Sequence, residues 1–420
     1  MASPTPMLIR RIALGLLASL VLGAAAARQP NAELATGRIV AAAWPYLGGS
    51  LIPLRINGFS PPFQAVLLGP GRLLPGGIYE VPAQSADASA LLVAGNGAVL
   101  ATVTLRTAPP PPAGRALVIV ASYDDGLMFH DARDFRALGV LATGGTPSDV
   151  AVDALGRIAT TDTDGTALTI ATLSPWSVAH VDGVVLGDEI AIDRTTGAVF
   201  VTDRDWNGSG ALTRVDRNGA VVRVATGATA EGLAIDDVRQ MVYVANANDA
   251  TVTVVNARTM RVARRFHAVS RIFSLALSAD GLRLYGISNQ STGSPFGAAG
   301  AAVIISLRDA IPRVIARSAD LEFPVGIALD AATHTLFVTD EAAGRVYVLD
   351  ARSLRPRRSP LRTCATPWEP ALDAAGRRLY VPCAGANAID AFDERTLRRV
   401  SGAPFPTGSY PLAVAVWHPQ

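Results

Sequence analysis

The phrase PSDVAVD, at residues 147–153, is the first of seven similar phrases, each with a small Ala in fifth place. The other six are GDEIAID (187–193), AEGLAID (230–236), IFSLALS (272–278), PVGIALD (324–330), PWEPALD (367–373) and PLAVAVW (411–417). Successive copies begin 40, 43, 42, 52, 43 and 44 residues apart. Four-stranded propeller blades repeat with this period, so the phrase predicts an all-β propeller.

The sequence after most phrases supplies the remaining strands of a blade. LFVTDEAAGRVYVLDA (336–351) contains two β-rich runs around a polar turn, which is a hairpin signal. A basic, β-branched run such as RTMRVARRF (258–266) then provides an outer strand. Because blade strands are buried between neighbouring blades, their apolar runs are nearly continuous.

The last phrase has no hairpin after it. VIVASYDDGLMFHDA (118–132) has the form of a hairpin, and RALGVLATGG (136–145) that of an outer strand, but no phrase precedes them. We therefore expect a seven-bladed β-propeller, closed by the C-terminal strand joining the N-terminal blade. This closure leaves no open blade edge.

The segment VYVANANDATVTVVNARTMRV (242–262) resembles the YVTN repeat of YncE-like propellers, which are found in the bacterial periplasm and in archaeal surface layers. The other blades match the repeat more loosely, and the resemblance covers residues 115–420. It implies an exported seven-bladed, WD40-like propeller. The family has no shared catalytic motif, so the resemblance assigns no functional residue.

The chain before the propeller divides into three predicted segments. Residues 1–27 have the form of a signal peptide, with Arg10 and Arg11 before an apolar core and Ala24–Ala27 at the cleavage site. Residues 28–107 predict a small β-sandwich-like domain, and PLRINGFSPPFQAVLLG (53–69) faintly resembles the IPT/TIG type of Ig-like domain. Residues 108–114 form a Pro-rich linker. We expect a periplasmic or secreted protein with no transmembrane span after cleavage.

Composition excludes several chemistries. All 37 basic residues are Arg, so Schiff-base chemistry and a P-loop lysine are ruled out. Without Arg10 and Arg11, the 35 remaining basic residues balance 35 acidic ones, which argues against nucleic acid as a partner. The five histidines are scattered, and we expect them on the surface or in turns.

The only two cysteines, Cys364 and Cys383, fall at the same end of two neighbouring strands of one predicted blade. In an oxidising compartment we expect them to form a disulfide. The alternative is a pair of separate small core residues. Their spacing suits neither a zinc site nor a haem site.

The face at which the first strands begin, called the top face here, is where binding is expected, because blade loops meet there. The chain is poor in aromatic residues, yet several map to this face, together with carboxylates around the channel mouth. The candidate ligand-binding residues are Asp149, Asp188, Glu189, Trp206, Glu231, Phe273, Phe296, Trp368, Glu369 and Tyr410. Aromatic side chains and a few polar groups in a concavity are typical of a ligand site.

A second set of polar residues recurs from blade to blade. Asp162, Asp203, Asn246 and Asp340 each follow a second strand. Because they are periodic, we interpret them as turn-stabilising residues and not as metal ligands. The loop SNQSTGSPFGAAGA (288–301), in the longest interval, is either a lid or a loop without a role.

These observations favour a non-catalytic binding or scaffold protein, expected to be a monomer without a cofactor, for an unidentified small molecule or protein. No catalytic residue set is recognisable. One alternative is a calcium-dependent hydrolase of the lactonase or gluconolactonase type, in which Asp188, Glu231 and Glu369 would contribute to the ion site. Another is a surface-layer or adhesion component, suggested by the possible Ig-like domain.

Overall fold

The fold is that of a computed structural model. The structure describes residues 32–35, 38–40, 44–55, 63–68, 72–74, 78–81, 88–94, 99–163, 165, 167–204, 209–269, 271–289 and 300–420. These residues form strands and turns, and the only helical segment among them is the 3-10 turn η1 at Ala384–Ala386. Within this part of the chain, no helix is long and apolar enough to cross a membrane. The predicted all-β class is confirmed.

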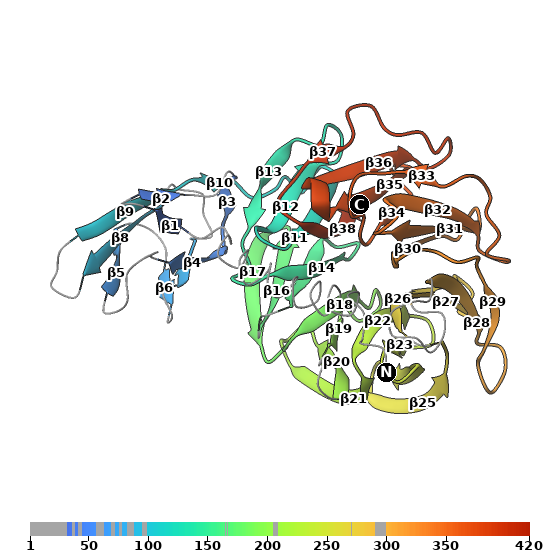
Figure 1. The fold of residues 1–420 in the computed structure, drawn as a ribbon. Coiled ribbons are helices and arrows are strands. Elements are labelled where there is room, and N and C mark those ends of the chain that lie inside the picture. The colour runs from blue at the N-terminus through green and yellow to red at the C-terminus, as the bar shows by residue number, and fades with distance from the viewer. Residues whose placement is uncertain are drawn as a thin grey trace, which may run out of the picture.

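Six four-stranded antiparallel sheets are arranged as the blades of a propeller (Figure 1). Within each sheet the strands are paired in chain order. The first strands of successive sheets contact one another, so they lie at the centre and the fourth strands lie at the rim. The first three sheets contain β14 (Pro147–Val152), β15 (Arg157–Asp162), β16 (Ala167–Leu173) and β17 (Trp176–Asp182); β18 (Gly187–Ile192), β19 (Val199–Asp203), β20 (Ser209–Val215) and β21 (Val221–Ala228); and β22 (Ala230–Asp236), β23 (Met241–Asn246), β24 (Thr251–Asn256) and β25 (Arg261–His267). The next three contain β26 (Ile272–Leu277), β27 (Arg283–Ser288), β28 (Ala301–Ser306) and β29 (Arg313–Arg317); β30 (Pro324–Asp330), β31 (Thr335–Asp340), β32 (Arg345–Asp350) and β33 (Leu361–Arg362); and β34 (Ala371–Asp373), β35 (Arg378–Cys383), β36 (Ala388–Asp393) and β37 (Phe405–Pro406).

The hydrophobic core lies between successive sheets. One cluster joins Ala245 and Val252 of one blade to Leu275 and Leu284 of the next, and similar clusters recur around the ring. Because each blade is covered on both faces, its strands need apolar residues at consecutive positions and not at alternate ones. This requirement explains the nearly continuous apolar runs of the repeat.

A six-stranded sheet carries the two ends of the propeller segment. Its order is β10 (Thr107–Ala108), β3 (Tyr46–Leu47), β13 (Ala137–Leu141), β12 (Gly126–Asp131), β11 (Leu117–Ser122) and β38 (Pro411–Trp417). Strand β38 pairs antiparallel with β11, with Leu117 opposite Trp417 and Ile119 opposite Ala415. Strand β38 also contacts β14 on one side and β34 on the other.

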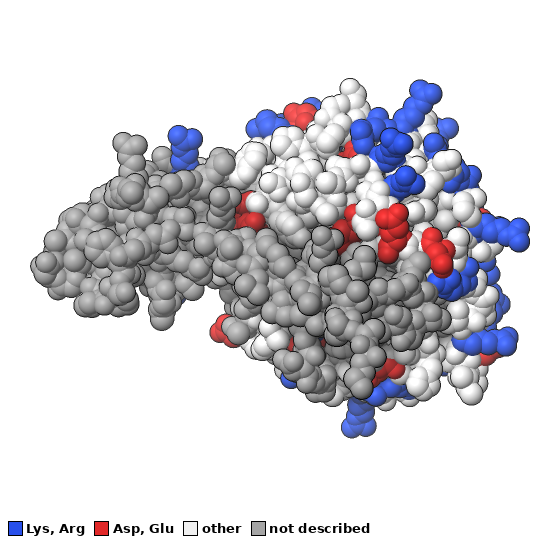
Figure 2. All heavy atoms as spheres, in the orientation of Figure 1, with Lys and Arg blue, Asp and Glu red and all other residues white. Residues whose placement is uncertain are grey.

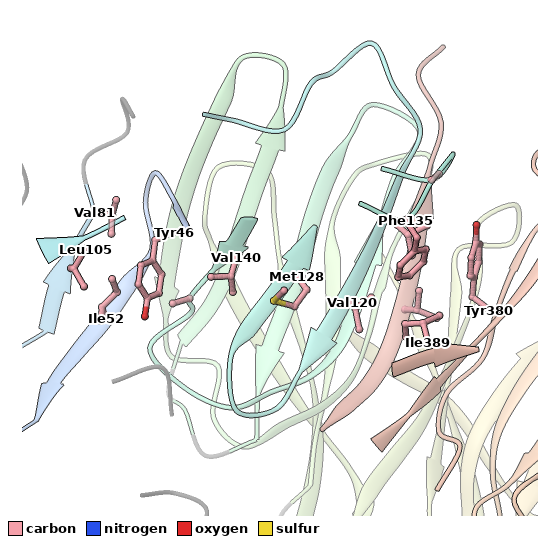
Figure 3. Packing of buried hydrophobic residues seen from close by; sticks show 14 of the residues in the cluster. Tyr46, Ile52, Val81, Leu105, Val120, Met128, Phe135, Val140, Tyr380 and Ile389 are labelled. Atoms are coloured by element: carbon pink, nitrogen blue, oxygen red, sulfur yellow. The ribbon is translucent and has the colours of Figure 1, made fainter. Parts of the chain in front are cut away.

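Strands from the N-terminal segment extend this sheet outward. Strand β3 pairs with β13 and β10, and β10 spans the boundary predicted between residues 107 and 108. Trp176 Nε1 donates a hydrogen bond of 3.0 Å to the Gly48 carbonyl. Tyr46 and Ile52 share one hydrophobic cluster with Val140 and Met128 (Figure 3). The N-terminal segment is therefore packed against the propeller.

The rest of the N-terminal segment contains two sheets. One is five-stranded, with β2 (Arg38–Val40), β1 (Ala32–Ala35), β4 (Leu51–Arg55), β7 (Ile78–Glu80) and β6 (Arg72–Leu74). The other is three-stranded, with β5 (Phe63–Leu68), β8 (Ala88–Ala94) and β9 (Val99–Leu105). The Ig-like relationship stays a prediction, and the expected signal peptide at 1–27 lies outside the described residues.

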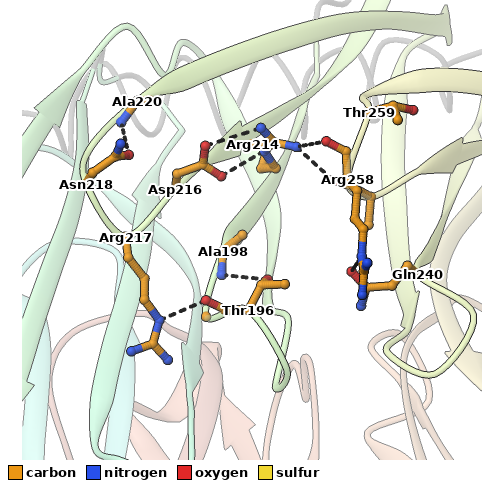
Figure 4. Close-up of polar contacts among 12 residues, drawn as sticks. Thr196, Ala198, Arg214, Asp216, Arg217, Asn218, Ala220, Gln240, Arg258 and Thr259 are labelled. Atoms are coloured by element: carbon orange, nitrogen blue, oxygen red, sulfur yellow. Dashed lines mark hydrogen bonds and ion pairs between the residues drawn. The ribbon is translucent and has the colours of Figure 1, made fainter.

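Arginine side chains connect the turns of neighbouring blades. Arg214 Nη1 donates to the carbonyls of Ala257 and Arg258, at 2.9 and 2.6 Å, in the next blade (Figure 4). Arg239 Nη2 donates to the Asp280 carbonyl at 3.1 Å in the same way. A guanidinium group has five donors and suits such contacts better than an ammonium group. Other Arg side chains are spread around the periphery, with Asp and Glu among them, on the face seen in Figure 2.

One histidine corrects the expectation that all five lie on the surface or in turns. His130 is fully buried in β12 and stacks on Phe135, with ring centroids 4.5 Å apart. Its Nε2 lies 2.9 Å from Thr407 Oγ1. Burial lowers the pKa of His130 to about 4, so this side chain is a neutral core residue at pH 7.

Cys364 and Cys383 are joined in a disulfide, with their Cα atoms 5.7 Å apart and a sequence separation of 19. The bond ties the approach to β34 to the end of β35. We expect the double variant Cys364→Ala/Cys383→Ala to lose about 3 kcal/mol of unfolding free energy, because the crosslink no longer restricts the unfolded chain. Urea denaturation measures this loss.

The wild-type protein in dithiothreitol serves as the matched control, since it keeps both sulfur atoms in the core. Its unfolding free energy should fall to that of the double variant. An unchanged denaturation midpoint under reducing conditions would show that the disulfide contributes nothing to stability.

Candidate functional site

The predicted carboxylates occupy the second and third places of the repeated phrase, where the first strands begin. In β14, β18, β22, β26 and β30 the pairing with the second strand shifts register at these two places, which indicates a β-bulge. A bulge re-aims the side chains that it carries. A recurrent β-bulge therefore sets the direction of the candidate carboxylates on β14, β18 and β22, whereas Glu369 lies on the approach to β34.

Three third-place carboxylates accept hydrogen bonds from backbone amides. Asp149 Oδ2 accepts from the Ile190 amide at 2.9 Å, and Oδ1 accepts from Val150 at 2.7 Å. Glu189 accepts from the Leu233 amide of the following blade. Because these bonds cross from one first strand to the next, both side chains hold adjacent blades together.

Glu369 has a similar arrangement on the approach to β34. It accepts hydrogen bonds from the Ile327 amide of the preceding blade and from Ser274 Oγ, the latter at 3.4 Å. Its own amide donates to the Leu412 carbonyl at 3.0 Å. Glu369 therefore contacts three other first strands, β26, β30 and β38.

The same carboxylates strongly affect one another's ionisation. Burial raises the pKa of Asp149 to about 7, although its two amide hydrogen bonds act in the opposite direction. Burial raises the pKa of Glu189 well above its usual value, and the charges of Glu369, Asp149 and Asp188 raise it further. The pKa of Glu369 is raised by burial and then by Asp149. The carboxylates thus form one electrostatically coupled cluster, here called the channel cluster: Asp149, Asp188, Glu189, Glu231 and Glu369.

The two second-place carboxylates pair with an arginine. Arg204 follows β19, and its Nη1 lies 3.2 Å from Asp188 Oδ1 and 4.0 Å from Glu231 Oε1. The Glu231 side chain is 0% exposed, and neither of its oxygens has a hydrogen-bond partner among the described residues. Burial raises its pKa well above the usual value, although Arg204 favours the charged form. Glu231 is therefore a buried carboxylate with both oxygens available as acceptors.

A second arginine was also missed by the sequence analysis. Arg271 immediately precedes β26, lowers the pKa of Glu231 and lies 5.5 Å from the centre of the Phe273 ring. The predicted carboxylates lie inside the repeated phrases, and the periodic polar residues lie at the ends of the second strands. Arg204 directly follows the end of β19 and Arg271 directly precedes the phrase that begins at Ile272, so a basic residue flanking these positions is the signal that identifies both.

Three of the predicted aromatic residues, Phe273, Trp368 and Tyr410, belong to the described part of the chain, and their rings are not in contact with one another. Phe273 and Trp368 are partly buried on two different blades, and Trp368 Nε1 has no hydrogen-bond partner within the described residues. Tyr410 instead contacts Tyr123 edge to face, with ring centroids 6.2 Å apart. Burial raises its pKa to about 12, and its charged neighbours are Glu341 and Asp124. Trp206 and Phe296 lie outside the described residues.

The periodic residues after the second strands have structural partners. Asp340 accepts amide hydrogen bonds from Glu322, Phe323 and Ala343, at 2.8 to 3.0 Å. Asn246 Nδ2 donates to Thr251 and Thr253, both at 2.9 Å. The turn-stabilising interpretation therefore fits the contacts of these two residues.

The arrangement suits a cation or a positively charged group better than general acid–base chemistry on a fixed nucleophile. Five carboxylates face two arginines, so the cluster carries excess negative charge when it is ionised. Within the described part of the chain, no group of three or more His, Cys, Asp or Glu is arranged to hold a metal ion.

No protein-family model matches the chain, and no curated protein shows significant sequence similarity to it. Solved structures do resemble its fold. A protein of unknown function from Desulfotomaculum acetoxidans DSM 771 is 14% identical, covers 72% of this chain and 99% of its own, and has a TM-score of 0.58. A putative 6-phosphogluconolactonase from Bacteroides fragilis NCTC 9343 is 11% identical, with coverage of 72% and 98% and a TM-score of 0.57. Kuenenia stuttgartiensis hydrazine synthase is 15% identical, with coverage of 68% and 94% and a TM-score of 0.57. At these identities the similarity supports the propeller fold alone.

Proposed function

We propose that this chain is an exported binding propeller that takes a positively charged group of its ligand, a protonated amine, into the channel cluster. The observation that carries the proposal is the gathering of five carboxylates around Arg204 and Arg271, with both buried oxygens of Glu231 lacking a hydrogen-bond partner within the described residues. The raised pKa of Glu189, caused by burial and then by the neighbouring carboxylates, agrees with it. Buried carboxylates that raise one another's pKa are costly to ionise together, and a bound cation would relieve that repulsion. Aromatic side chains at the same face, such as Phe273, can also contact an ammonium group.

We further infer that the ring has seven blades and is closed by its C-terminal strand, as in YncE-like propellers. The inference is supported by the pairing of β38 with β11 and by the contacts of β38 with both β14 and β34. Export is inferred from the signal-like residues 1–27 and agrees with a disulfide between Cys364 and Cys383.

Spermidine is a suitable probe of the proposed function. Binding of its ammonium groups should lower the pKa values of the cluster, so protons should be released near pH 7. Calorimetric titration in two buffers of different ionisation enthalpy counts these protons. We expect Glu231→Gln to weaken binding about tenfold, because it removes the buried carboxylate whose oxygens have no hydrogen-bond partner within the described residues.

Glu322→Gln is the matched control, since Glu322 is an exposed carboxylate outside the cluster. It should bind spermidine as the wild type does. Saturable binding without proton release, or equal binding by the wild type and Glu231→Gln, would contradict the proposal. A parallel titration with calcium chloride distinguishes amine binding from the alternative of a calcium-dependent lactonase. That alternative requires calcium to bind and the calcium-bound protein to hydrolyse a lactone.

A further inference from the structure

A pocket of about 330 Å³ lies at the other end of the first strands from the channel cluster. Its charged and imidazole side chains are Arg115, Asp131, Arg133, Asp373, Arg378 and His418. These residues come from the approach to β11, the end of β12, the β34–β35 turn and the residue after β38. The pocket is thus formed at the junction between the six-stranded sheet and the β34 blade.

The topology explains why an opening exists here. In the other blades a tight turn joins the first strand to the second at this end, as in the Asp153–Arg157 turn, where the Asp153 amide donates to the Arg157 carbonyl at 2.9 Å. Strands β38 and β11 pair without being consecutive, so no such turn connects them. Residues 114–116 and His418 border the space that a turn fills elsewhere.

Both carboxylates of the pocket are already engaged. Asp131 accepts from Arg115 Nη1 and from the Arg133 amide, each at 3.0 Å. Asp373 Oδ1 accepts from the Gly376 amide at 2.8 Å and lies 2.7 Å from His418 Nε2. Both side chains are almost completely buried, at 5% and 3% exposed. The carboxylates therefore offer little further acceptor capacity.

The arginine side chains of the pocket, in contrast, still have hydrogen-bond donors that are not used. The guanidinium group of Arg133 makes no hydrogen bond or ion pair within the described residues. Arg378 uses Nη1 for the Ala132 carbonyl, at 2.8 Å, and for the Tyr380 hydroxyl, at 3.3 Å, which leaves its other nitrogens available. Arg115 uses one nitrogen for Asp131 and has a side chain that is 49% exposed. Three guanidinium groups thus present unused donors to one pocket.

We propose that this pocket binds a small phosphate monoester. Guanidinium groups match the geometry of phosphate oxygens and bind them through paired hydrogen bonds. The volume is at the lower end of ligand pockets, so it suits a small phosphorylated metabolite and not a nucleotide. The site is separate from the channel cluster and does not depend on the function proposed for it.

Calorimetric titration of the whole protein with glycerol 3-phosphate tests the site, with succinate as a second dianion. We expect saturable binding of glycerol 3-phosphate and a Kd raised about tenfold by Arg133→Gln, because one phosphate-binding guanidinium is lost. Arg136→Gln is the matched control: Arg136 is exposed nearby but does not line the pocket. Its Kd should equal that of the wild type.

The variant Gly114→Leu tests whether binding needs the pocket itself or only the positive charge of the arginines at the surface. A Cβ at Gly114 would meet no atom within 4 Å, so a leucine can be added at the border of the pocket while every arginine is retained. We expect this variant to lose binding and keep the wild-type melting temperature. Absence of wild-type binding, equal binding by Gly114→Leu and the wild type, or binding of succinate in preference to glycerol 3-phosphate would each overturn the proposal.

Discussion

Deletion of residues 411–420 is expected to abolish cooperative unfolding of the propeller. This change removes β38, whose Leu412, Val414 and Trp417 are at most 7% exposed. Each such side chain contributes about 1.5–3 kcal/mol through burial. The deletion also exposes the backbone edge of β11 and uncovers two hydrophobic clusters. Since whole domains are stable by only about 5–15 kcal/mol, we expect no native state to remain. Near-ultraviolet circular dichroism during thermal denaturation measures the loss.

A shorter deletion and a synthetic peptide distinguish the effect of losing β38 from the effect of shortening the C-terminus. Deletion of residues 419–420 alone leaves β38 intact and should preserve the melting transition. A synthetic peptide of residues 408–420, added to the truncated chain, should restore pairing with β11 and return a cooperative transition. A truncated chain that melts like the full-length protein would refute the role assigned to β38.

The second large effect concerns pH. We expect the wild-type protein to lose about 3 kcal/mol of unfolding free energy between pH 5 and pH 8 because of the channel cluster. Burial raises the folded-state pKa of Asp149 to about 7, and those of Glu189, Glu231 and Glu369 also rise. At these carboxylates the folded protein therefore binds more protons than the unfolded chain above about pH 4. Stability falls as the pH increases through this window.

The histidines act in the opposite direction and in a lower window. The pKa values of His130 and His180 are lowered by burial, so the unfolded chain binds more protons below about pH 6.5. Their contribution makes the protein less stable as the pH falls from 6.5. A variant in the cluster isolates the carboxylate effect, because the histidines are the same in both proteins.

Glu189→Gln is the most informative variant, since a glutamine oxygen can still accept the hydrogen bond from the Leu233 amide. We expect it to be about 1–2 kcal/mol more stable than the wild type at pH 8 and nearly equal to it at pH 5. Urea denaturation at pH 5, 6.5 and 8 gives the comparison. Glu322→Gln, outside the cluster, should follow the wild-type profile. A constant difference between Glu189→Gln and the wild type at all three pH values would rule out the predicted coupling.

The repeated phrase was sufficient to predict the strands at the centre of the propeller. PSDVAVD corresponds to β14 (Pro147–Val152), and PLAVAVW coincides with β38 (Pro411–Trp417). These predictions succeeded because apolar patterning and turn residues are local properties of the chain. The Cys364–Cys383 pair could be placed for the same reason, since both residues belong to one predicted hairpin.

The contacts of the N-terminal segment with the propeller, and the side-chain hydrogen bonds between blades, were not predictable. The two-residue strand β3 carries no strand signal of its own, and it forms because Tyr46 and Leu47 lie against β13 and β10. The backbone hydrogen bonds of Asp149 and Glu189 were missed because they depend on the bulges and on the exact position of the next blade. The sequence identified these carboxylates as binding candidates, whereas the structure also assigns them a role in joining blades.

The pairing of β38 with β11 has a consequence for the order of folding. The chain is synthesised from the N-terminus, so β11 is made nearly 300 residues before its partner strand β38. Leu117 can pair with Trp417 only after β38 has been synthesised. During that interval the edge of β11 is exposed, and unpaired strand edges promote aggregation. Contacts of such long sequence separation also slow folding. The pairing of β11 with β38 therefore cannot form until both strands have been synthesised.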